Sequence, residues 1–192
     1  LRNTLLGIVF TSVALIGTWG TVQWIPLWID QMTGATIKEA KANAIMLSAI
    51  GAIIDCLLWP LVGGKIGRRP TYFLLCVSAL LTCAYMYRGG HTYWPLLQFL
   101  ILLTGLTTAA FYVWFPLFLP ELFPTRMRAT GQGVCFNTWR VFAAVGAIYG
   151  GQLVKSFGGD YARAGSVVIL IYFVGMVAIW FAPETKGKPL PD

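Results

Sequence analysis

Long apolar runs alternate with short charged or Gly- and Pro-rich breaks along the whole chain. A helix needs about 20 largely apolar residues to cross a bilayer, and each run is close to or above that length. The pattern therefore predicts an all-α membrane protein with one six-helix transmembrane bundle over residues 1–192. The predicted helices span approximately residues 4–29, 42–64, 71–87, 95–119, 129–154 and 165–181.

Composition narrows the class of protein further. Hydrophobic residues make up 57% of the chain and charged residues only 11%, whereas a soluble domain has about a quarter of its residues charged. The net charge of +7 would suggest nucleic acid in a soluble protein, but the basic residues fall mainly in the short connections between helices. We therefore expect the lipid bilayer, and not nucleic acid, as a partner.

The distribution of basic residues predicts the orientation of the bundle. With six helices, eight of the 14 Lys and Arg residues lie on the side of the termini, five on the other side, and Arg140 within a helix. Positive residues are enriched in cytoplasmic connections. We expect a multi-pass protein of a plasma or inner membrane with both termini in the cytoplasm.

Arg140 lies midway along the fifth predicted helix. An Arg at that depth costs about 2.5 to 3.5 kcal/mol to insert, so it should face protein or a wet cavity. Its predicted helix face also carries Gly133, Asn137, Ala144 and Ala147. The planar guanidinium can bind both oxygens of a substrate carboxylate. A structural ion pair, with Asp55 or with an acid outside this chain, is the alternative.

Asp55 is the matching acid near the centre of the second helix. A buried carboxylate can serve proton coupling. Alternatively, Asp55 could pair with Arg140, or make a capping contact with backbone loosened by Pro60. Helices one to three also overlay weakly on helices four to six, with Asp55 and Arg140 each in the middle helix of a triplet. Paired triplets with a site between them are a transporter architecture.

Aromatic and amide residues crowd the first and fourth helices. Trp19, Gln23 and Tyr112 lie deepest, so we interpret them as candidate cavity residues, with ordinary packing as the alternative. The sequence has no hydrolase, zinc or phosphate-binding motif and one histidine, so we expect no enzyme activity, cofactor or metal site. It also lacks the filter loop of a channel.

Three segments resemble the major facilitator superfamily. Residues 63–70, Gly-Gly-Lys-Ile-Gly-Arg-Arg-Pro, are similar to its cytoplasmic loop signature, although Gly64 stands at the Asp position and Lys65 at the first Arg. Residues 120–131 resemble the stretch between its tenth and eleventh helices. Residues 183–187, Pro-Glu-Thr-Lys-Gly, resemble the tail after its twelfth. The resemblance covers the whole chain as the C-terminal half, helices seven to twelve.

This resemblance implies alternating access and a cytoplasmic charge relay. Glu121 would pair with Arg68 or Arg128 to hold one state closed, with Lys65 and Arg69 in the same gating group. The sequence around Arg140 and residues 24–28 looks most like metabolite/proton symporters, which include aromatic-acid carriers, and organic-ion transporters. In those relatives an Arg at this position is associated with organic anions.

The sequence thus predicts half of a secondary transporter for a small organic anion, such as an aromatic or other carboxylate, coupled to protons. Its substrate residues would be Arg140, Asn137, Trp19, Gln23 and Tyr112, with Asp55 for protons. Because one half supplies one bundle, we expect a second half, from another copy or from a missing N-terminal half. One alternative is a non-transporting module that must pair with another half. Another is a sugar or organic-cation porter of the same superfamily.

Overall fold

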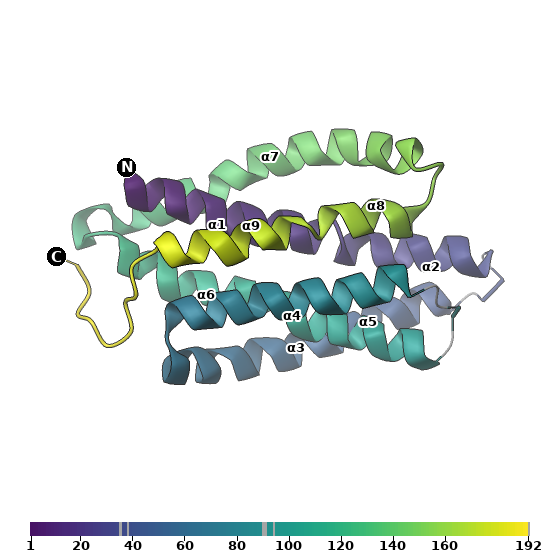
Figure 1. The fold of residues 1–192 in the computed structure, drawn as a ribbon, viewed down its shortest axis with the longest axis horizontal. Helices are drawn as coiled ribbons and strands as arrows, with labels where there is room; N and C mark the ends of the chain where they lie inside the picture. The colour runs from purple at the N-terminus through teal and green to yellow at the C-terminus, as the bar shows by residue number, and fades with distance from the viewer. Residues whose placement is uncertain (35, 38, 90–91, 94, 192) are drawn as a thin grey trace.

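Most of the described residues of the computed structural model are helical, which confirms the predicted all-α fold (Figure 1). It describes every residue except 35, 38, 90–91, 94 and 192, and only the backbone of residues 142–148. With η for a short 3₁₀ helix, the elements in chain order are α1 (Arg2–Trp19), η1 (Val22–Trp24), α2 (Ile25–Thr33), α3 (Ala40–Ile66), α4 (Arg68–Arg88), α5 (Pro95–Thr108), α6 (Phe111–Phe118), η2 (Leu119–Leu122), η3 (Thr125–Met127), α7 (Arg128–Ser156), α8 (Tyr161–Val168), α9 (Ile171–Ala178) and η4 (Ile179–Phe181).

Three of the predicted helices are interrupted in the structure. The run predicted as 4–29 is divided into α1, η1 and α2, the run 95–119 into α5, α6 and η2, and the run 165–181 into α8, α9 and η4. The other three correspond to α3, α4 and α7, each longer than predicted by one to three residues at either end. Two of the interruptions fall at apolar residues, Ala109 and Ala110 in one and Ile169 and Leu170 in the other, so hydropathy alone could not reveal them.

The interruption between α1 and η1 is stabilised by hydrogen bonds from two side chains, one local and one from α4. The Thr21 hydroxyl donates to the Gly17 carbonyl at 2.6 Å, and the Tyr87 hydroxyl of α4 donates to the Thr21 carbonyl, also at 2.6 Å. Side chains thereby satisfy backbone groups that a continuous helix would pair internally. Gly17 leaves room for the Tyr172 ring, which lies 2.5 Å from where a Cβ would stand.

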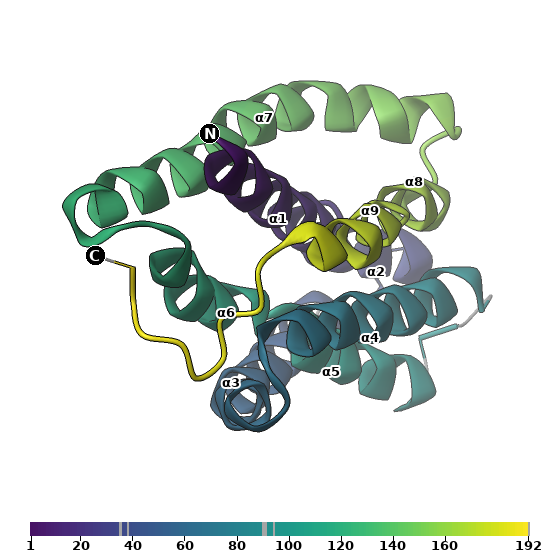
Figure 2. The ribbon, with the colours of Figure 1, turned by 60° about the vertical axis from the view of Figure 1, so that its left-hand side comes forward.

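Helices α3 and α5 pack more closely than side chains would allow. A Cβ on Gly51 would overlap the carbonyl oxygen of Leu102, and a Cβ on Gly105 would overlap that of Ser48. Small residues at helix crossings in membranes permit such backbone contact. The α3–α5 pair therefore forms a tight unit at one side of the bundle (Figure 2).

The connections separate into two groups at opposite ends of the molecule. Both termini, the α3–α4 turn and the η2–η3 segment lie at one end, here called the termini end, at the left of Figures 1 and 2. The α2–α3, α4–α5 and α7–α8 connections lie at the other end. Helix α7 crosses α1 and then runs apart from the other helices (Figure 2).

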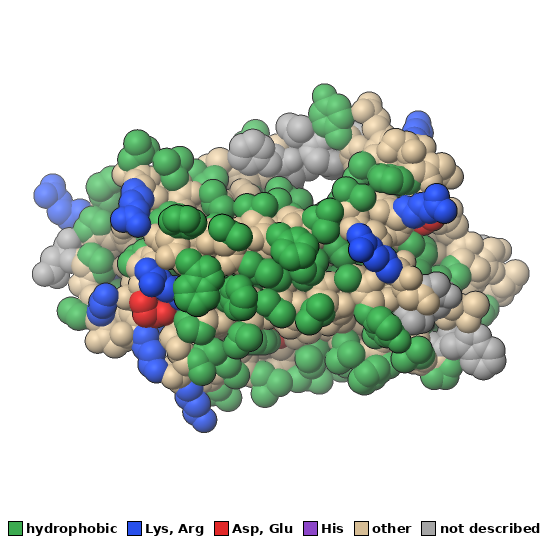
Figure 3. All heavy atoms as spheres, viewed as in Figure 1, with side chains coloured by type: hydrophobic (Ala, Val, Ile, Leu, Met, Phe, Trp, Pro, Cys, Tyr) green, Lys and Arg blue, Asp and Glu red, His purple; other side chains and the backbone are tan. Residues whose placement is uncertain are grey.

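The outer surface is suited to lipid. In Figure 3, hydrophobic side chains cover the visible face between the ends, while charged side chains gather near the two ends. Within the described residues, five helical segments are long and apolar enough to cross a membrane: Arg2–Thr33, Ala40–Ile66, Arg68–Arg88, Pro95–Leu122 and Tyr161–Phe181. Helix α7 is also long, at 29 residues, but polar residues such as Gln132, Asn137 and Arg140 lower its hydropathy.

Candidate functional site

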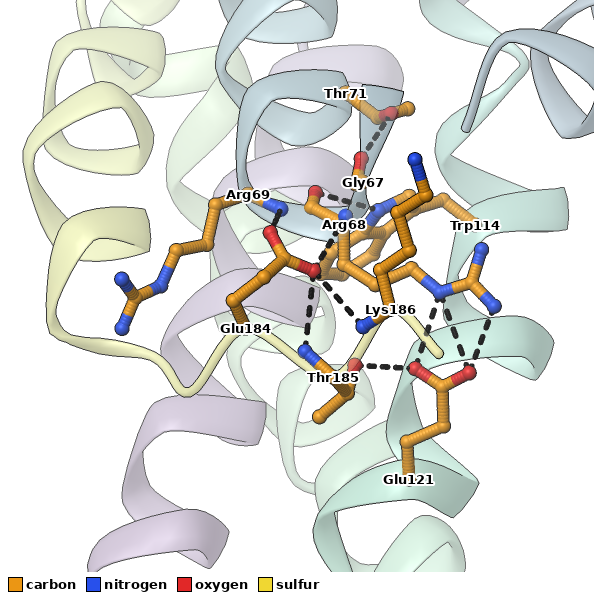
Figure 4. A network of polar contacts seen from close by, with 9 residues as sticks. All are labelled: Gly67, Arg68, Arg69, Thr71, Trp114, Glu121, Glu184, Thr185 and Lys186. Atoms are coloured by element: carbon orange, nitrogen blue, oxygen red, sulfur yellow. Dashed lines mark hydrogen bonds and ion pairs between the residues drawn. The ribbon is translucent and has the colours of Figure 1, made fainter. Parts of the chain in front are cut away.

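The termini end holds a network of charged and polar groups, shown in Figure 4. At its centre, the Arg68 guanidinium binds the Glu121 carboxylate in a bidentate pair, with Nη2 to Oε1 at 2.7 Å and Nε to Oε2 at 3.1 Å. The side chains are only 16% and 17% exposed. The Thr185 hydroxyl donates to Oε2 of Glu121 at 2.5 Å. These contacts join α4, η2 and the C-terminal tail, residues 182–191.

Glu184 of the same tail caps the start of α4. Its carboxylate oxygens accept the backbone N–H groups of Arg68 at 2.9 Å and Arg69 at 3.0 Å (Figure 4). The first N–H groups of a helix lack internal partners and attract negative charge. Burial raises the pKa of Glu184, but these donors and the N–H groups of Lys186 and Thr185 outweigh it, so the pKa lies below its usual value.

Gly67 makes this cap possible. Its φ of +104° lies in the region that favours glycine, and a Cβ there would stand 3.0 Å from Oε2 of Glu184. Sequence reasoning missed Glu184 and Thr185 as members of the network. Both residues belong to the Pro-Glu-Thr-Lys-Gly segment that the sequence analysis singled out, but no contact between that segment and the rest of the chain was predicted.

The remaining residues of the predicted gating group surround this network without pairing with Glu121. Arg69 donates to the Ala182 carbonyl, and Lys65 offers its own carbonyl to the Lys186 ammonium. Arg128 donates to the Pro120 carbonyl at 3.2 Å and the Pro191 carbonyl at 3.1 Å. Of the two partners predicted for Glu121, the structure therefore has Arg68. We call Arg68, Glu121, Glu184 and Thr185 the termini-end network.

A cavity of about 680 Å³ lies between α1, η1, α7 and α8. Two of the predicted substrate residues, Trp19 and Gln23, line it. The Trp19 indole donates to the Tyr112 hydroxyl of α6 at 2.9 Å and lies 6.2 Å from the Trp139 ring of α7. Tyr112 is thus in contact with the lining without being part of it. The described lining carries no acidic or basic side chain and consists of Ile16, Trp19, Gly20, Gln23, Trp24, Trp139, Tyr149, Gly150, Gly151, Gln152, Leu153, Ser156 and Val168.

Arg140 and Asn137 lie on α7 but outside this described lining. Both are exposed, and the Asn137 amide donates to the Gly133 carbonyl one turn earlier at 2.8 Å. Arg140 follows Trp139, which is 5% exposed and faces the cavity. The side chains of Ala144 and Ala147, predicted on the same helix face as Arg140, lie outside the described residues.

Asp55 is fully buried on α3 and is not paired with Arg140, which is exposed. Its Oδ2 atom accepts the backbone N–H of Ala110 at 2.5 Å, at the interruption between α5 and α6. Of the readings left open by the sequence, the structure thus shows a capping contact. Its location was predicted wrongly, because the capped group belongs to α6 and not to the backbone around Pro60.

Comparisons with known proteins agree with this architecture. The Major Facilitator Superfamily family model matches residues 7–192. The chain is 27% identical to a probable 4-methylmuconolactone transporter of Cupriavidus pinatubonensis, 26% to a cis,cis-muconate transport protein of Acinetobacter baylyi, and 24% to an ectoine/proline transporter of Corynebacterium glutamicum. The alignments cover 89%, 90% and 98% of this chain, and 39%, 41% and 38% of the relatives. The chain thus spans about two fifths of the length of these curated relatives.

Proposed function

We propose that this chain, which belongs to the major facilitator superfamily, is the C-terminal six-helix half of a secondary transporter for small organic carboxylates. It is an integral, multi-pass membrane protein of a transporter family, and not an enzyme. In the proposed arrangement, its helices form two three-helix repeats, and a second half, from an N-terminal partner or another copy, completes the bundle for alternating access. Both termini would face the cytoplasm of a plasma or inner membrane.

The aromatic cavity beside α7 is the observation that carries the substrate proposal. Its indole rings and the amides of Gln23 and Gln152 suit a flat organic body with a few hydrogen-bonding groups. The next residue after the lining residue Trp139 is Arg140, a cation near the middle of α7. We propose that Arg140, with Asn137, binds the carboxylate at the edge of the cavity while Trp19, Gln23 and Tyr112 contact the body of the substrate. Muconate, named for one relative, has this chemistry.

Proton coupling is the second part of the proposal. Asp55 is a fully buried carboxylate within a membrane-spanning segment, and such groups are functional by default. We propose that it carries or tunes the proton step. Uptake driven by an imposed pH gradient should therefore fall in Asp55→Asn, which cannot ionise.

Gating at the termini end is the third part. The proposed gate consists of the Arg68–Glu121 pair with Lys65, Arg69 and Arg128 around it, and it holds one state closed. Glu121→Gln removes the charge of one partner, so cysteines introduced at the termini end should change their labelling rate. An unaltered labelling pattern would count against the gate.

Uptake of cis,cis-muconate into sealed vesicles that contain the assembled transporter tests the substrate proposal. A hydrogen bond to a charged group contributes about 1.5 to 3 kcal/mol, and a factor of ten corresponds to about 1.4 kcal/mol. Arg140→Ala should therefore reduce uptake at least tenfold, and Arg140→Lys should reduce it less. Arg163→Ala is the matched control, because Arg163 lies outside the cavity and pairs with Asp160 on the surface. Unchanged uptake in Arg140→Ala, with normal insertion, contradicts the assignment.

A non-transporting module is the second candidate, favoured by the fact that the chain spans about two fifths of its relatives. Such a module would serve as a binding or assembly partner for another membrane protein. The mass of the assembly in nanodiscs separates the possibilities. A lone copy without uptake supports the module, whereas a dimer or a complex with a second half that takes up muconate supports the transporter.

A further inference from the structure

A side chain of another helix forms a hydrogen bond at the interruption between α5 and α6. In a continuous helix, the Ala110 N–H would donate to the carbonyl of Leu106. Here it donates to Oδ2 of Asp55 on α3 at 2.5 Å, while α6 restarts with the N–H groups of Val113 and Trp114 bonded to the Ala110 carbonyl. A charged acceptor forms stronger hydrogen bonds than a neutral one. The carboxylate therefore replaces the missing helical acceptor at this point.

The position of Asp55 is fixed by the close packing of α3 on α5. Gly51 lies one helical turn before Asp55, and its backbone contacts that of Leu102 and Leu106. Because the two backbones are in contact there, α3 and α5 can shift little relative to one another. The neighbouring Cys56 thiol also lies 3.9 Å from the Ala109 carbonyl, so side chains of α3 contact both the C=O and the N–H of the Ala109–Ala110 peptide.

The segment that follows the interruption contributes to both functional regions. Two residues after Ala110, the Tyr112 hydroxyl accepts a hydrogen bond from the Trp19 indole N–H at the cavity. Further along α6, the Trp114 indole donates to the Arg68 carbonyl at 3.2 Å, and η2 then supplies Glu121 to Arg68. The positions of Tyr112 and Glu121 therefore depend on the direction in which α6 continues from Ala110.

We propose that Asp55 is a positioning residue that sets the direction of α6, and thereby places Tyr112 at the cavity and Glu121 in the termini-end network. This role lies beyond the proton role proposed above, and its consequence for transport rests on the proposed function. The positioning role depends on an acceptor oxygen at the Oδ2 position and not on ionisation of the carboxyl group. Asparagine can supply that oxygen, whereas alanine cannot.

Amide hydrogen exchange in the full chain in nanodiscs tests the contact directly. We expect the amide of Ala110 to exchange at least tenfold faster in Asp55→Ala than in the wild type, and Asp55→Asn to stay within threefold of the wild type. Asp30→Ala, which removes an exposed carboxylate paired with Lys41 at 3.8 Å, is the control and should leave this amide unchanged. If Asp55→Ala fails to fold, Asp55→Ser, whose hydroxyl is too short to replace Oδ2, takes its place with the same expectation.

Rescue by asparagine separates positioning from proton transfer. Fast exchange in Asp55→Ala together with protection in Asp55→Asn supports the inference, even where Asp55→Asn loses pH-driven uptake, because that loss belongs to the proton step. Wild-type exchange at Ala110 in Asp55→Ala overturns the inference, whatever the uptake. Equally fast exchange in Asp55→Asn and Asp55→Ala overturns it as well, because the oxygen would then be insufficient.

Discussion

The termini end and the cavity differ in how their charged groups are paired. At the termini end, the Arg68 and Glu121 side chains are mostly buried, and the Glu121 carboxylate accepts hydrogen bonds from both Arg68 and Thr185. The described lining of the cavity is aromatic and uncharged, while the nearby Arg140 is exposed and outside it. Fully paired groups hold a conformation, whereas an open space beside an exposed cation can accept an anionic ligand. The difference supports our proposals that the termini end forms a gate and that the cavity binds substrate.

Breaking the network should give the largest loss of stability. Arg68→Ala leaves Glu121 mostly buried without its cation, and breaking such a pair costs about 3 kcal/mol. The matched control is Arg163→Ala, because Arg163 pairs with Asp160 on the surface with side chains 72% and 39% exposed; it should cost less than about 1 kcal/mol. Denaturant unfolding in detergent measures both. Equal losses of unfolding free energy in the two variants would show that the buried pair stabilises the fold no more than the surface pair does.

Acid should loosen the termini end and spare the cavity. The folded-state pKa of Glu184 is lowered from an ordinary value of 4.5, so its contribution to stability is complete above that value. That contribution is lost as the pH falls through the lower folded pKa. A spin label at Lys188, an exposed tail residue, should gain mobility in this range.

Glu184→Gln provides the control for the acid effect. Because the Glu184 carboxylate is gone, the gain in label mobility between neutral pH and acid pH should be clearly smaller than in the wild type. The described cavity lining has no carboxylate, so tryptophan emission from the cavity should change little over the same range. Acid mobility that persists in Glu184→Gln would assign the effect to another group.

The smallest expected effect lies within the cavity wall. Trp19→Phe keeps an aromatic ring but removes the N–H that Tyr112 accepts at 2.9 Å. One neutral hydrogen bond contributes about 1 kcal/mol, or roughly fivefold in affinity. Tyr112→Phe should weaken muconate binding to a similar extent, and the double variant should add no further loss. Additive losses would mean that the two side chains act separately.

The sequence predicted the parts of the molecule that depend on composition and local pattern. The apolar runs predicted α3, α4 and α7 to within three residues at each end, because a bilayer demands long helices. The family resemblance of the loop segments predicted Arg68 as a possible partner of Glu121, and the two side chains form an ion pair in the structure. Trp19 and Gln23, chosen for their depth in the first helix, both line the cavity.

What the sequence could not predict depends on contacts between distant segments. The interruption at Ala110 has no proline or glycine beside it and is capped by Asp55, 55 residues earlier. The cap of Glu184 on α4 joins residues 116 positions apart. In each case a polar group finds its partner through the packing of helices, and no local pattern encodes that distance.

The contact proposed between Arg140 and a substrate carboxylate is tested most directly by comparing two ligands that differ in that group alone. The binding of cis,cis-muconate and of its dimethyl ester to the assembled transporter can be titrated calorimetrically, with wild type and Arg140→Ala side by side. We expect the wild type to bind the acid at least tenfold more tightly than the ester, and Arg140→Ala to lose that preference. An undiminished preference for the acid in Arg140→Ala would contradict the proposed role of Arg140 and leave the cavity without its carboxylate partner.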